Sequence, residues 1–166
     1  MRCRAWMVAL PLVAAGCPGT MLSQLETGYA YGPNSSGNAH AGSLAGHIGG
    51  SSVPGAGIGA TVRTRAWNGG WAFPEFGPHG FVLVENDSPI AFYSRLSLTG
   101  GLSGVGGDIG PIFTATLTPG IILYPADEPV GITLSGVVAA HAAPAASDTQ
   151  VWFGVRIGVA VGGVHD

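Results

Sequence analysis

Apolar side chains alternate with small or polar side chains near the end of the chain. From residue 151 to residue 162 every second side chain is apolar, and those between are mostly Gly or Ala. Such a period of two places the two sets on opposite faces of a β-strand. The apolar set is Val151, Phe153, Val155, Ile157, Val159 and Val161, and the second set is Trp152, Gly154, Arg156, Gly158, Ala160 and Gly162. The pattern predicts a long strand.

The same alternation recurs in four earlier segments, at residues 56–67, 90–99, 109–123 and 130–139. Ile112 and Ile122 are exceptions, since they fall on the small-polar face. Clusters of Gly, Pro, Asn, Asp and Ser, which favour turns, separate the segments. These breaks lie at residues 32–38, 51–54, 68–77, 86–88, 104–108, 125–128 and 142–148. They imply eight strands, the first over the weakly patterned residues 24–31, and connections that alternate long and short, beginning with a long one.

The second face of the strands distinguishes a membrane barrel from a soluble sandwich, because alternation alone fits both. Only 9% of the residues are charged, there is no lysine, and 29 of the 166 residues are Gly. A face that meets water would carry charged groups, whereas Gly, Ala, Ser and Thr fit the inside of a narrow barrel whose apolar face meets lipid. We therefore predict an all-β fold, a single antiparallel up-and-down barrel of about eight strands. The alternative is a soluble sandwich or lipocalin-like module that binds a small apolar ligand.

Strand length agrees with a membrane barrel for most segments. Strands of about 13–15 residues, at about 3.3 Å per residue, are about 45 Å long. Tilted by about 45°, they would span about 30 Å, the thickness of a hydrocarbon core. Pro119 conflicts with this picture, because a proline inside a closed sheet removes a backbone N–H. Either a bulge at Pro119-Gly120 or a split into two strands is expected there.

The four arginines of the predicted barrel all fall on the small-polar face. This placement is favourable, since an arginine that faces lipid at mid-bilayer costs about 2–4 kcal/mol. Guanidinium groups crowded in a lumen need counter-charges, and Glu85 and Glu75 are the candidate partners. Two roles are open for such a cluster: an ion-pair network that makes the barrel rigid, or a vestibule that attracts anions. The predicted lumen charge cluster consists of Arg63, Arg65, Arg95, Arg156 and Glu85.

The first residues predict an export signal. Arg2 and Arg4 form a short basic start, and residues 5–15 are an apolar run that is too short to cross a bilayer as a helix. We assign residues 1–16 to a signal peptide and residues 17–166 to the barrel domain.

Residues 13–17 (VAAGC) resemble a bacterial lipoprotein box, whose cysteine becomes the acylated first residue of the mature protein. This resemblance implies lipidation of Cys17. Ala14 stands where that family prefers Leu, Val or Ile, and Ala14 and Gly16 also suit ordinary signal peptidase cleavage, so both interpretations stay open. Removal of residues 1–16 would leave four arginines against nine acidic residues, a net charge of −5. With that charge we expect no nucleic-acid partner.

Residues with reactive side chains do not form a recognisable motif. The five histidines include no HExxH spacing, and Cys17 would be the only cysteine of the mature chain. The nearest approach to a catalytic group is His141 with Ser147 and Asp148, but no neighbouring pattern orients them. The glycine-rich residues 100–107 lack the lysine of a phosphate-binding loop. We expect no catalytic, metal or cofactor site and no enzymatic activity.

Over residues 24–163 the pattern resembles the small eight-stranded barrels of bacterial outer membranes. This resemblance implies an outer-membrane protein with a structural or surface-interaction role, the latter carried out by its loops. Outer-membrane lipids and the barrel-assembly machinery would be its partners, and it would be a monomer. The last residues, Val164-His165-Asp166, depart from the family, whose members usually end on an aromatic residue. The soluble alternative would be a lipid-anchored protein of the periplasm or cell surface.

Overall fold

The computed structural model of the chain describes residues 19–34, 37–51, 53–85, 88–105, 107–125, 129–143 and 148–165. The regular structure of these residues is eight strands: β1 (Gly19–Asn34), β2 (Gly37–Ser51), β3 (Ala56–Trp67), β4 (Gly70–Val84), β5 (Ile90–Val105), β6 (Asp108–Leu123), β7 (Val130–Ala143) and β8 (Asp148–His165). The strands contain 12 to 18 residues, against about five or six in most soluble sheets. Within these described ranges, no helix is long and apolar enough to span a membrane.

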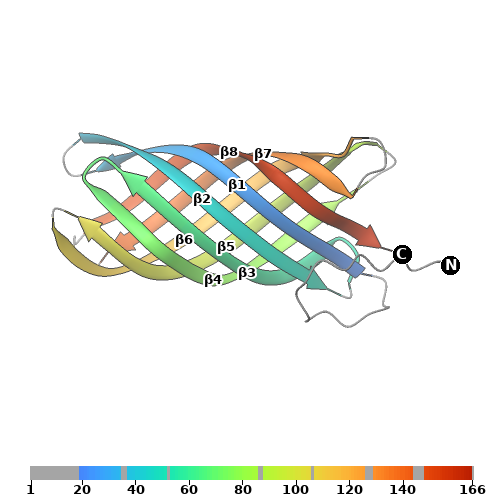
Figure 1. The fold of residues 1–166 in the computed structure, drawn as a ribbon, viewed down its shortest axis with the longest axis horizontal. Helices are drawn as coiled ribbons and strands as arrows, with labels where there is room; N and C mark the ends of the chain where they lie inside the picture. Colours follow the sequence, from blue (N-terminus) through green and yellow to red (C-terminus); the bar gives the residue numbers. More distant parts are fainter. Residues whose placement is uncertain are drawn as a thin grey trace.

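Each strand pairs antiparallel with the next one in the sequence, and β8 pairs with β1, so the sheet closes into a barrel (Figure 1). The predicted all-β, eight-stranded, up-and-down barrel is confirmed. The soluble sandwich is wrong, because a sandwich needs two packed sheets and here one sheet pairs with itself. Gly19 pairs with His165, so the two ends of the described chain lie at the same end of the barrel.

The predicted alternation sets the two faces of the barrel. On β8, Val155 and Ile157 are 60% and 55% exposed, whereas Arg156 between them is 5% exposed. The outward face is apolar, and the inward face carries the small and polar residues. Ile112 and Ile122, the two exceptions to the apolar pattern, obey the same geometry, because both side chains point inward and are buried.

The sequence predicts the longer connections at one end of the barrel, and the structure has most of them at the other end. Two residues connect β3 to β4, where the sequence predicts a long loop over residues 68–77, and the β1–β2 and β5–β6 connections are equally short. Gly69 and Gly107 have φ angles of 87° and 100°, which glycine adopts without steric cost. The connections at the end that holds the termini are residues 52–55, 85–89 and 124–129, and at the opposite end the β7–β8 connection, residues 144–147, is as long as the first of these. The long loops predicted over residues 32–38, 68–77 and 104–108 are wrong, because most of their residues belong to strands.

Two prolines inside strands are accommodated in different ways. At Pro74 in β4, the register with β5 shifts between Ala72 and Glu75. This bulge puts Glu75 on the inward face only three residues after the inward-facing Ala72. At Pro119, β6 continues with neither the bulge nor the split that the sequence suggests, and its pairs with β7 on either side keep one register. The missing N–H therefore interrupts the ladder only locally.

Side chains fill the lumen in three layers. An apolar layer near the termini and a second one near the opposite end enclose buried charged residues between them. The first layer is Leu22, Phe81, Leu83, Ala91, Tyr93, Ile122 and Ala160. The second layer is Ala39, Ala41, Val137, Ala139 and Trp152, with Ala30 and Trp67 packed against it. The fold thus holds charged side chains inside a barrel whose outer face is apolar.

Candidate functional site

The candidate functional site is the charged layer of the lumen, which the strand alternation assembles from several strands. The four arginines predicted to face the lumen do so and are buried: Arg63 and Arg65 on β3, Arg95 on β5 and Arg156 on β8. Glu26 of β1 and Glu75 of β4 are the acidic residues of this layer, and both are 0% exposed. Two ion-pair centres result, one around each carboxylate.

The first centre forms around Glu75. Arg65 Nε donates to Glu75 Oε2 over 2.7 Å, and Arg63 donates from Nε and Nη2 over 3.3 and 3.2 Å. The hydroxyls of Thr99 and Thr114 donate to Oε1 over 3.2 and 2.7 Å. The carboxylate therefore has several donors, as a buried charge requires. One negative charge is shared by two guanidinium groups.

The second centre forms around Glu26. Arg95 Nη2 donates to Glu26 Oε2 over 2.5 Å, and the Tyr93 hydroxyl donates to Oε1 over 2.7 Å. His47 Nε2 lies 3.3 Å from Oε2. Arg156 Nη1 lies 3.7 Å from the same oxygen, which is too far for a hydrogen bond. Here too one carboxylate faces two guanidinium groups, and Arg156 is the more weakly held.

Three buried histidines join this polar network. Nδ1 of His47 and Nδ1 of His79 lie 2.9 and 3.0 Å from the Thr61 hydroxyl. His141 faces the lumen from β7, and its Nδ1 lies 2.6 Å from Nη1 of Arg65. Among the residues with described positions, no group of three or more His, Cys, Asp or Glu is arranged to hold a metal ion. The histidines here are parts of the hydrogen-bonded lumen.

Glu85 is not a member of the charged layer, contrary to the prediction. It follows β4 at the end of the barrel that holds the termini, next to Tyr124. Burial raises the pKa of Tyr124 to about 12, and the charge of Glu85 adds to the shift. The partner that the sequence interpretation missed is Glu26. No local signal shows which way Glu26 points, because the alternation of residues 19–34 is weak.

Some predicted features fall outside the described residues. These are the signal peptide over residues 1–16, the lipidation site Cys17, Ser147 and the side chain of Asp148. His141, the third member of the group with Ser147 and Asp148, points into the lumen and contacts Arg65.

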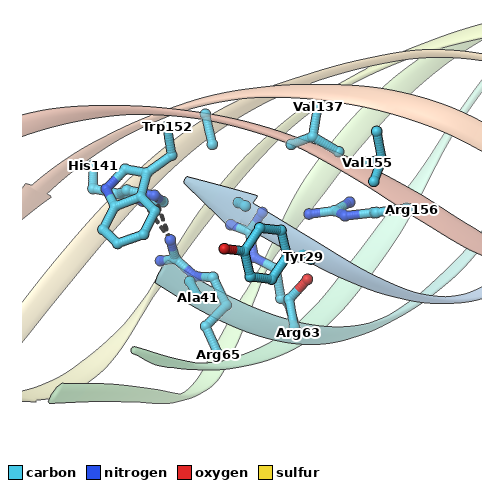
Figure 2. Close-up of a pocket in the computed structure, with 12 residues that line it drawn as sticks. Tyr29, Ala41, Arg63, Arg65, Val137, His141, Trp152, Val155 and Arg156 are labelled. Carbon is cyan, nitrogen blue, oxygen red and sulfur yellow. Dashed lines mark hydrogen bonds between the residues drawn. The ribbon is translucent and has the colours of Figure 1, made fainter. Parts of the chain in front are cut away.

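A small internal cavity lies beside the charged layer (Figure 2). Its volume is about 20 Å³, which is room for about one water molecule. Arg63, Arg65, Arg156 and His141 line it, together with residues of the second apolar layer such as Trp152.

Comparisons with known proteins find likeness in fold and not in sequence. No protein-family model matches the chain, and no curated protein sequence matches it significantly. The crystal structure of Neisserial surface protein A superposes with a TM-score of 0.64 and 15% identity, over 85% of this chain and 96% of that one. A de novo designed transmembrane β-barrel gives a TM-score of 0.45 and 17% identity, over 89% of this chain and 98% of that one.

Proposed function

We propose that this chain is a structural protein of a bacterial outer membrane, a barrel with an apolar outer surface and a closed lumen. The outer surface is the observation that carries the proposal. Large apolar side chains cover the outward face of every strand, from Leu25 on β1 to Ile157 on β8. Asp108, at the start of β6, is the only exposed charged residue whose side chain is described. Contact between such a surface and water is unfavourable, whereas contact with the hydrocarbon of a membrane is favourable.

Aromatic side chains on the outer face support this proposal. Most of them lie in the half of the barrel opposite the termini, within a few residues of the short connections. Tyr and Trp favour the interface between hydrocarbon and water, so this belt would mark one edge of the membrane. The outward aromatic residues of this half are Tyr29, Tyr31, Trp71, Phe73, Phe76, Phe113 and Phe153, while Phe92 lies toward the other end.

The lumen favours a structural role over transport or the binding of an apolar ligand. Two apolar layers enclose the charged layer, and the cavity beside it has a volume of about 20 Å³. A lipocalin-like module for an apolar ligand would need a larger cavity lined by apolar side chains. The connections at the end opposite the termini are short, so a surface role that depends on long loops has little support. We assign no enzymatic activity to the barrel.

The membrane proposal predicts that the protein stays in the outer-membrane fraction after washing with carbonate or high salt. The reason is the apolar band, which would aggregate outside lipid or detergent. Fractionation of the native host followed by immunodetection measures this, with a peripheral membrane protein as the control that the wash releases. Recovery as a monodisperse protein in detergent-free buffer would overturn the proposal.

We also propose that Cys17 carries a lipid, on the basis of the VAAGC sequence at residues 13–17. Metabolic labelling with a fatty-acid analogue is expected to label the wild type and not Cys17→Ser. Equal labelling of the two proteins would show that Cys17 does not carry the lipid. The barrel proposal does not depend on this result.

A further inference from the structure

The described part of the lumen holds more positive than negative charge. Four buried arginines face two buried carboxylates, and each carboxylate is shared by two arginines. Arginine stays protonated in proteins, and any protonation of His47, His79 or His141 would add to the excess. Charge that is buried without a counter-ion is strongly unfavourable. An additional monovalent anion in the lumen would halve this excess.

Arg156 is the arginine that lacks a close partner. Arg63, Arg65 and Arg95 each donate at least one hydrogen bond to a carboxylate, and Arg63 and Arg65 also donate to threonine hydroxyls. In the described part of the chain, the guanidinium of Arg156 makes no hydrogen bond, and its nearest carboxylate oxygen is 3.7 Å away. Its side chain is nevertheless 5% exposed. Its N–H groups are therefore available to a ligand inside the barrel.

The cavity lies where this excess charge is concentrated. Arg156 of the Glu26 centre and Arg63 and Arg65 of the Glu75 centre all line it (Figure 2). Ser43 of β2 adds a hydroxyl to the lining. A volume of about 20 Å³ is room for about one water-sized particle, and halide ions are the inorganic anions nearest to that size.

We propose that this cavity is a binding site for one small inorganic anion of halide size, such as chloride. Arg156 donates charge-assisted hydrogen bonds to the anion, and the Ser43 hydroxyl is a further donor. Arg63 and Arg65 have their N–H groups engaged elsewhere, so they contribute positive potential. The anion would act as the counter-charge that links the two ion-pair centres. This inference depends on the lumen charges alone and not on the cellular location.

The experiment uses the full chain refolded in detergent micelles and unfolded with urea at constant ionic strength. Sodium chloride or bromide is titrated against sodium gluconate, and sulfate is tested separately. We expect the unfolding midpoint to rise with halide and to reach a plateau, because the anion binds only the folded state. Gluconate should give no such rise, because it is far larger than a halide, and sulfate, which stabilises folded proteins by exclusion from their surface, should raise the midpoint without a plateau. Equal midpoints in chloride and gluconate, or a rise with sulfate that reaches the same plateau as with halide, would overturn the proposal.

Two variants and one control locate the site. Arg156→Gln removes the principal donor, and Ala139→Asp places a carboxylate on the cavity wall. Both are expected to lose the halide dependence, the second because its own carboxylate takes the place of the anion. Asp108→Asn changes an exposed residue far from the cavity and should keep the wild-type dependence. A halide dependence that persists in Arg156→Gln or Ala139→Asp would rule out this site. If one of these variants does not fold, the other alone is enough for the test.

Discussion

Glu75→Gln is expected to lower the free energy of unfolding by about 3–5 kcal/mol, the cost of breaking a buried ion pair by removing one partner. The Glu75 carboxylate accepts hydrogen bonds from both Arg63 and Arg65 inside the lumen. Glutamine has a similar size but no charge, and its amide nitrogen cannot accept from a guanidinium. Two buried arginines would then share no counter-charge. Equilibrium urea unfolding in micelles, followed by circular dichroism, measures the loss.

Asp108→Asn is the matched control for this experiment. It removes the same charge from an exposed position and should change the stability by no more than about 0.5 kcal/mol. The double variant Glu75→Gln/Arg65→Gln should be less destabilised than the sum of its single variants, because it removes both members of a pair. If Glu75→Gln unfolded at the same urea concentration as Asp108→Asn, Glu75 would not be the counter-charge of the arginines.

The sequence predicts which residues face the lumen because strand alternation is a local property. Arg63, Arg95 and Arg156 lie in segments whose neighbours alternate clearly, and all three are found inside. Residues 19–34 alternate less clearly, since Ser23 and Thr27 occupy positions on the outer face. The inward direction of Glu26 was therefore not evident. Which acid meets which arginine depends on the register of strands far apart in the sequence, and no local pattern contains that information.

Loop positions were predicted less well, for a physical reason. Gly and Pro disfavour isolated strands, so residues 68–77 and 104–108 read as breaks. In the closed barrel both neighbours of each strand supply hydrogen-bond partners, so β4 already begins at Gly70 and β5 continues to Val105. The bulge at Pro74 makes this possible and also turns Glu75 inward. The same residues that resemble a loop thus place one of the two carboxylates of the charged layer.

Ile157→Arg is expected to destabilise the barrel by about 2–4 kcal/mol in a lipid bilayer, which is the cost of an arginine that faces hydrocarbon at the midplane. Ile157 lies near the middle of β8, points outward and is 55% exposed. The new guanidinium would have no partner on a face that is apolar around it. The measurement is equilibrium folding of the variant and the wild type into phospholipid vesicles.

Val161→Arg distinguishes a membrane from water as the surroundings of the outer face. Val161 is on the same face of β8, nearer the end that holds the termini, and is 49% exposed. Near an interface, arginine costs only about 0–1 kcal/mol, so Val161→Arg should be tolerated better than Ile157→Arg. Gly158→Ala is a control for packing. The added Cβ would clash with the backbone carbonyl oxygen of Leu25 whether lipid or water surrounds the barrel. Equal, small effects of the two arginine variants would mean that the outer face does not meet hydrocarbon, and the membrane assignment would then be wrong even though the barrel itself remained.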